Sequence, residues 1–146
     1  MADRDVAPKV GQVVVHHFLW FEEQTAGLVE GRKPRPCVII AVEPDPAGTG
    51  YKTTVLPITS RKPRADAHAV AVPPSLKRTL GLDQARDAWV IVDDANVFTW
   101  PGFDLVPQAG GGFARGLVTA GFFQQLREAV LLARGRGRPR RIDRDS

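Results

Sequence analysis

The chain has a single cysteine, Cys37, and only three histidines among its 146 residues. One thiol excludes an internal disulfide and is typical of a reducing cytosol, so we interpret Cys37 as a small apolar side chain of a strand. So few cysteine and histidine ligands argue against a structural zinc site, and we expect neither a metal nor a cofactor.

Long hydrophobic runs are also missing from the sequence. No stretch approaches the roughly 18 consecutive apolar residues that a membrane span requires. The first fifteen residues, MADRDVAPKVGQVVV, contain no apolar run long enough for the core of a signal peptide. We therefore expect a cytoplasmic protein without a membrane partner, and a hydrophobic content of 43% is enough for one globular domain.

Charge of one sign is concentrated in two places. Residues 134–146 carry six arginines and two aspartates, which equals the net charge of the whole chain, +4. Residues 32–86 hold ten cations and four anions, whereas the segments on either side of them are net negative. This distribution predicts one positive face, and a solvated scatter of cations over the surface is the alternative.

Short apolar runs bounded by glycine, proline and aspartate predict a mainly β protein. The predicted strands are 11–18, 37–42, 51–58, 67–74, 88–94, a short edge strand at 96–100, and 116–121. The turn sequence EPDPAGTG makes residues 37–58 a hairpin. Many short strands in one small domain predict a strongly bent antiparallel barrel over residues 10–134.

Two segments have helical patterns. Residues 74–82 predict a short helix that begins at a proline and ends at Gly81. A longer helix is predicted from about Thr119, a suitable N-cap, to Arg134, because its apolar residues form one stripe. Residues 135–146 follow as a basic tail whose composition predicts disorder.

Two basic motifs lie at predicted strand ends, GRKPRPCVIIAV from Gly31 and TTVLPITSRKPR from Thr53. Together with GQVVVHHF and VIVDDANVF, they resemble the four signature strands of the PemK/MazF family of toxins from bacterial toxin–antitoxin pairs. The likeness extends over roughly residues 10–134. It is most specific in the Arg-Pro-hydrophobic element and in PITS.

This resemblance implies an SH3-like barrel with a C-terminal helix and a homodimer. It also implies a metal-independent endoribonuclease that cleaves single-stranded RNA by attack of the substrate's own 2′-OH, which leaves a 2′,3′-cyclic phosphate. A cognate antitoxin with a disordered acidic tail would lie across the same groove. Matched by motif, the catalytic residues would be Arg35, Thr59 and Asp93.

An arginine suits the charge that develops on the phosphate, and Pro34 and Pro36 restrict the backbone on both sides of Arg35. Asp93 could accept the 2′-OH proton, or it could instead form an ion pair with Arg35. Further RNA contacts are predicted for exposed cations, hydroxyls and one stacking ring. These residues are Ser60, Arg61, Lys62, Arg64, Lys33 and Trp20.

Each of these residues also has a purely structural interpretation. Arg35 could be an exposed turn cation, Thr59 and Ser60 ordinary turn formers, and Asp93 a solvated turn residue. Some relatives carry an arginine in the later strand, where this chain has Ile91 and Asn96. The alternative hypothesis is therefore a non-catalytic PemK-like module that binds RNA or a protein, or a ribosome-associated SH3-like domain.

Overall fold

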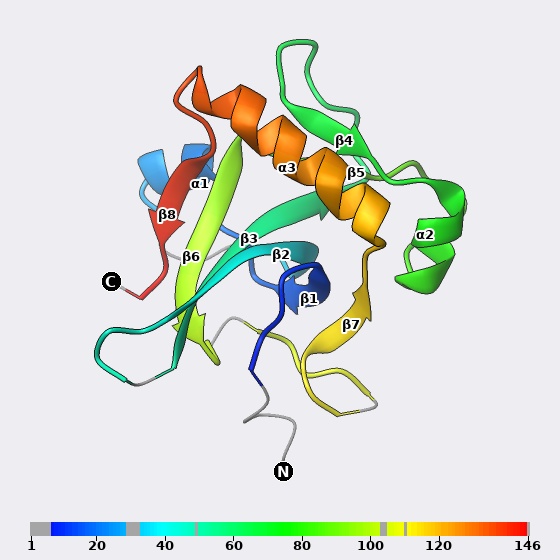
Figure 1. The fold of residues 1–146 in the computed structure, drawn as a ribbon. Helices are drawn as coiled ribbons and strands as arrows, with labels where there is room; N and C mark the ends of the chain where they lie inside the picture. The colour runs from blue at the N-terminus through cyan, green and yellow to red at the C-terminus, as the bar shows by residue number, and fades with distance from the viewer. Residues whose placement is uncertain (1–6, 29–32, 49, 103–104, 110, 146) are drawn as a thin grey trace.

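The computed structural model describes residues 7–28, 33–48, 50–102, 105–109 and 111–145 (Figure 1). Gly31 and Arg32, which begin the first basic motif, lie outside this range. The helices are α1 (Phe21–Thr25), α2 (Pro74–Thr79) and α3 (Ala120–Arg134). The strands are β1 (Gln12–His16), β2 (Arg35–Pro44), β3 (Tyr51–Thr59), β4 (Ala69–Ala71), β5 (Trp89–Ile91), β6 (Asp94–Trp100), β7 (Ala114–Leu117) and β8 (Arg140–Asp143).

The strands form one sheet in the order β4-β5-β3-β2-β1-β7. Strand β6 pairs with the first part of β3, along the same edge where β5 pairs with the last two residues of β3. The β2–β3 hairpin is confirmed by a register that runs from Cys37 opposite Pro57 to Pro44 opposite Tyr51. No pairing among the described residues joins β7 to β4, so the sheet is open at both ends. The mainly β class with a C-terminal helix is confirmed, whereas the SH3-like antiparallel barrel stays a prediction.

Side chains of the hairpin alternate between two apolar cores, one on each face of the sheet. On the face covered by α3, which we call the α3 face, Val38 and Leu56 pack with Leu126 of the helix. On the opposite face, which we call the α1 face, Cys37 and Val55 pack with aromatic residues, among them Phe98. The two faces therefore present different side chains to different parts of the chain.

The helix predictions hold well. Thr119 is the N-cap of α3, where its hydroxyl accepts a hydrogen bond from the amide of Phe122 at 3.1 Å. In the shorter helix, Leu76 is buried, as is Leu80 directly after it, which agrees with their spacing of one helical turn. In the described residues, no helix is long and apolar enough to cross a lipid bilayer.

The C-terminal segment corrects two predictions. Residues 140–143 form β8, which runs parallel to β6 with Asp94 opposite Arg140 and Val97 opposite Asp143 (Figure 1). The prediction of a disordered tail is wrong for these residues, because Ile142 is buried and neighbouring arginines have fixed partners. For the same reason β6 is not an edge strand: β3 lies on one side of it and β8 on the other.

Candidate functional site

The hairpin register brings the two basic motifs together at one end of the sheet. Cys37 on β2 lies opposite Pro57 on β3, the last pair of this ladder, and Arg35 and Thr59 each lie two residues beyond it in their strands. Residues two apart in a strand project to the same face. Residues opposite each other in an antiparallel pair project to the same face. Arg35 and Thr59 therefore belong to the α1 face, and we call this region the strand-end site.

Arg35 is half-buried against the loop that precedes α1. Its guanidinium carbon lies 5.3 Å from the ring centre of Trp20, a distance suited to a cation–π contact. Burial lowers the pKa of Arg35, and this is partly offset by negative charge on Cys37 and Glu23. Arginine remains charged at neutral pH despite such a shift, so the site holds a permanent cation.

Cys37 cannot supply that negative charge at neutral pH. Burial raises the pKa of its thiol, and the charge of Arg35 lowers it only in part, so the thiol stays protonated. Its sulfur contacts the carbonyl oxygen of Arg35 at 3.4 Å. Glu23 is therefore the carboxylate that acts on Arg35, and it also accepts a hydrogen bond from the Trp20 amide at 3.0 Å.

Thr59 is buried and ends β3, where its hydroxyl oxygen accepts a hydrogen bond from the amide of Arg61 at 3.1 Å. This bond shapes the turn that follows and leaves the hydroxyl proton available for a ligand. The four polar side chains of the turn that sequence analysis assigned to RNA binding are all exposed, and we call them the basic turn. They are Ser60, Arg61, Lys62 and Arg64.

The other two predicted RNA contacts lie on the β2 side of this region. Lys33 is exposed two residues before the start of β2. Trp20 is partly exposed and packs edge-to-face against Phe18, with ring centres 5.2 Å apart. One side of the indole is therefore part of the aromatic core, and Arg35 lies over the ring.

Asp93 does not join the strand-end site. One of its oxygens lies 2.8 Å from Nδ1 of His68 and 3.9 Å from Arg138, and the other accepts a hydrogen bond from the His68 amide at 2.9 Å. The structure therefore shows Asp93 paired with His68 and Arg138 instead of with Arg35. Sequence analysis did not select His68, because it lies in no motif and 25 residues away in the chain.

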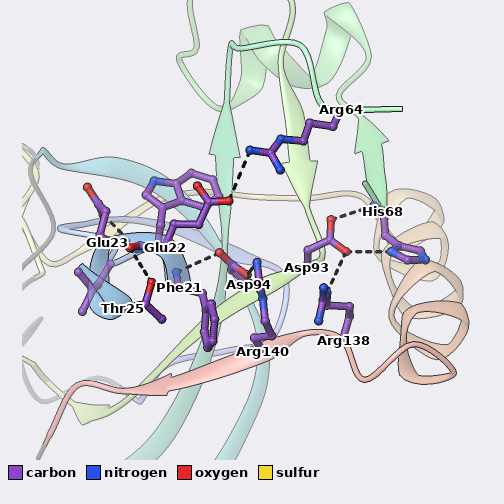
Figure 2. A network of polar contacts seen from close by, with 12 residues as sticks. Phe21, Glu22, Glu23, Thr25, Arg64, His68, Asp93, Asp94, Arg138 and Arg140 are labelled. Atoms are coloured by element: carbon purple, nitrogen blue, oxygen red, sulfur yellow. Dashed lines mark hydrogen bonds and ion pairs between the residues drawn. The ribbon is translucent and has the colours of Figure 1, made fainter. Parts of the chain in front are cut away.

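The neighbouring carboxylate, Asp94, faces the opposite way (Figure 2). It accepts a hydrogen bond from the Phe21 amide at 3.1 Å and lies 2.8 Å from the guanidinium of Arg140, which in turn stacks 4.2 Å from the Phe21 ring centre. Asp94 is almost fully buried, so its charge depends on these partners. This network ties the start of α1 to β6 and β8.

Asn96 fixes the loop just before α1. Its side-chain amide donates to the Leu19 carbonyl at 2.8 Å and its oxygen accepts from the Leu19 amide at 2.9 Å. The same oxygen accepts a hydrogen bond from Arg144 at 3.0 Å and lies 3.1 Å from Nε2 of His16. Because Trp20 directly follows Leu19, Asn96 and Arg144 determine where the ring beneath Arg35 lies.

The two positions that sequence analysis compared with a strand arginine are both buried in this chain. Ile91 is buried in the sheet and Asn96 is fully buried in the loop network. A guanidinium nevertheless reaches Asn96, from Arg144 in the C-terminal segment instead of from β6. The signal that sequence analysis missed was a lone asparagine within an apolar strand, which requires a buried polar partner.

A phosphate held between Arg35 and Thr59 would meet a fixed cation, a hydroxyl and an exposed basic turn. Among the described residues, no group of three or more histidine, cysteine, aspartate or glutamate side chains could hold a metal ion. The chain matches none of the protein-family models to which it was compared, and no curated protein matches it in sequence. The likeness to the PemK/MazF family therefore rests on the four motifs alone.

Proposed function

We propose that this protein is a metal-independent endoribonuclease of the PemK/MazF type, built on an SH3-like barrel, which cleaves single-stranded RNA at the strand-end site. The observation that carries the proposal is the β2–β3 pairing, since Arg35 and Thr59 each lie two residues beyond its last pair, Cys37 opposite Pro57, and the basic turn directly follows Thr59. A charged guanidinium and a hydroxyl on one side of a sheet are suited to grip a single phosphate.

In the proposed reaction the 2′-OH of the substrate attacks the adjacent phosphorus, and the bond to the 5′-oxygen of the next nucleotide breaks. Negative charge grows on the non-bridging oxygens in the transition state, where Arg35 and Thr59 donate hydrogen bonds to them. The products are a 2′,3′-cyclic phosphate and a 5′-OH end. An electrostatic contact of this kind typically contributes about 10²–10³ in rate.

The proton of the 2′-OH needs an acceptor near Arg35. Asp93 could accept this proton only after its contacts change, because one of its oxygens lies near both the His68 ring and Arg138 and the other accepts a hydrogen bond from the His68 amide. Glu23 already interacts with Arg35 through its charge. We therefore assign the general base to Glu23, and expect Glu23→Gln to slow cleavage more than Asp93→Asn does.

The resemblance supplies the wider proposal. The protein would act in the cytoplasm as a homodimer, and a cognate antitoxin would inhibit it by laying a disordered acidic tail over the strand-end site. The exposed cations of the basic turn are complementary to either ligand, because both RNA and an acidic tail carry negative charge.

A non-catalytic module that binds RNA or a protein is the second candidate. The engagement of Asp93 by His68 favours it, because the carboxylate expected to move a proton is held in a structural contact. In this version Arg35 and the basic turn bind a phosphate backbone and no bond is broken.

The two candidates differ in what Arg35→Ala does. Purified protein is incubated with end-labelled single-stranded RNA in EDTA, with Arg78→Ala, an exposed cation on α2, as the control variant. The nuclease predicts cleavage with cyclic-phosphate ends, lost in Arg35→Ala by a factor of about 10²–10³ and kept in the control. Intact RNA with all three proteins, with binding weakened only in Arg35→Ala, would refute the nuclease and support the module.

A further inference from the structure

A groove lies on the α3 face, on the opposite side of the sheet from the strand-end site. It runs between the second half of α3 and strands β2, β3 and β6, and its volume is about 380 Å³. Apolar side chains from both walls form its floor, among them Ile40, Val97 and Val130. Leu131 also lines the groove, with 57% of its surface exposed.

Three arginines line the groove around this apolar floor: Arg127 and Arg134 from α3, and Arg141 from β8. None of them forms an ion pair with another residue of the described ranges. The other two charges at the groove, Glu43 and Lys52, are opposite each other in the β2–β3 register and offset one another. Within the described part of the chain, the residues that line the groove therefore carry a net positive charge.

The spacing of the groove arginines indicates how carboxylates would be spaced in a bound peptide. Arg127 and Arg134 are seven residues apart on α3, which is about 10 Å along a helix. In a peptide in the polyproline II conformation, carboxylates at every third residue lie on one side about 9 Å apart, since this helix has three residues per turn and rises about 3.1 Å per residue. The residues between such carboxylates would face the apolar floor.

From these features we propose that the groove is a docking site for a segment of another protein that combines acidic side chains with aliphatic ones. An apolar centre with a charged rim is the usual anatomy of a protein–protein contact. A nucleic acid fits less well, because single strands bind through stacked aromatic rings, and Phe123 is the one aromatic residue lining this groove in the described part of the chain. The inference does not depend on the nuclease.

Fluorescence anisotropy tests the proposal with a short labelled peptide in which glutamate recurs at every third position with leucine between. Arg134→Glu combined with Arg141→Glu removes two groove cations. The matched control is Arg78→Glu combined with Arg86→Glu, which makes the same change in net charge at two exposed cations that line neither the groove nor the basic turn. We expect the groove variant to weaken binding at least about tenfold, and the control to leave it nearly unchanged.

Two further measurements complete the test. Leu131→Gln should also weaken binding, because the apolar floor contributes, and a peptide with glutamine in place of glutamate should bind poorly. Thermal unfolding shows whether the variants are folded, and Arg134→Gln with Arg141→Gln repeats the test with a milder change. RNA cleavage by the groove variant should match that of the unmodified protein, which separates this proposal from the nuclease.

Three outcomes would overturn the inference. Equal loss of peptide binding in the groove variant and the control would mean that any cation suffices. Loss of binding to a labelled oligonucleotide in the groove variant, with peptide binding kept, would make the groove a nucleic-acid surface. A change from dimer to monomer in sedimentation of the groove variant would make it a contact between two copies of this chain.

Discussion

The chain contains two arginine-rich segments with opposite structural roles. In the basic turn, the side chains of Arg61 and Lys62 are exposed, and Arg64 reaches the exposed Glu22 at 3.5 Å. In the C-terminal segment, residues 135–145, Arg140 and Arg144 are held by buried acceptors. Sequence analysis predicted RNA contacts for the first segment and disorder for the second, although the second makes the stronger contacts within the protein.

The difference is set by the acceptors, because both segments are equally rich in donors. Asp94 and Asn96 are buried on β6, and leaving either side chain without a partner would lower the free energy of unfolding. The C-terminal arginines donate some of these hydrogen bonds, and the same contacts hold their side chains in place. Among the described residues, Arg61 and Lys62 of the basic turn have no ion-pair partner, so these two cations remain available to an external anion. A cation at a binding site is therefore better identified by the lack of an acceptor within the protein than by its neighbours in the sequence.

The largest effect is expected when Asn96 is changed to alanine. The amide and carbonyl of Leu19 and the guanidinium of Arg144 would lose a partner inside the protein. We expect the free energy of unfolding to fall by about 3 kcal/mol, measured by urea denaturation.

Asn96→Asp is the matched variant. It keeps an acceptor for Leu19 and for Arg144 and loses one donor, so its cost should be clearly smaller than that of alanine. An equal loss in both variants would show that the cost comes from the volume of the side chain instead of its hydrogen bonds.

The next largest effect compares two carboxylates, each of which pairs with an arginine from one of the two segments. Asp94→Asn weakens a buried ion pair with Arg140 and should cost about 2 kcal/mol, because the guanidinium would remain beside an uncharged group. Glu22→Gln removes the exposed pair with Arg64 and should cost less than about 0.5 kcal/mol. Similar losses in the two variants, by the same denaturation measurement, would contradict the distinction between arginines with buried partners and arginines with exposed ones.

Much of the fold could be predicted from local patterns in the sequence. The β2–β3 hairpin and α3 follow from alternation, a turn sequence, an N-cap and an apolar stripe, all of which operate within about twenty residues. The parallel pairing of β8 with β6 could not be predicted in this way. It depends on contacts across 46 residues between Arg140 and Asp94, and composition alone favours disorder in the segment.

The site was predictable to a similar extent. The two motifs at strand ends led to Arg35 and Thr59, because a hairpin must bring the start of one strand to the end of the next. Motif matching assigned Asp93 to the site, whereas the structure pairs it with His68, because the sequence gives no register for the bend between β5 and β6 in which Asp93 lies. Glu23 was missed because it lies in α1, which directly follows the loop segment bound by Asn96.

A smaller effect is expected on RNA binding by the basic turn. If Arg61 and Lys62 each neutralise one phosphate, the double change to alanine should reduce the slope of log affinity against log salt concentration by about 1.4. The control is Arg78→Ala with Arg86→Ala, which removes two other exposed cations and should leave the slope unchanged. A slope that changes equally in both variants would show that RNA is attracted by net charge alone.

The smallest effect is expected within the C-terminal segment itself, at Arg138. Its guanidinium lies 3.9 Å from Asp93 and the side chain is 36% exposed, whereas Arg140, two residues later, lies 2.8 Å from the nearly buried Asp94. Arg138→Ala should therefore change the free energy of unfolding by less than about 0.5 kcal/mol, because His68 continues to hold Asp93. Arg140→Ala should cost clearly more in the same denaturation experiment. If Arg138→Ala were the more costly of the two, distance and burial of the acceptor would not be what fixes an arginine in this protein.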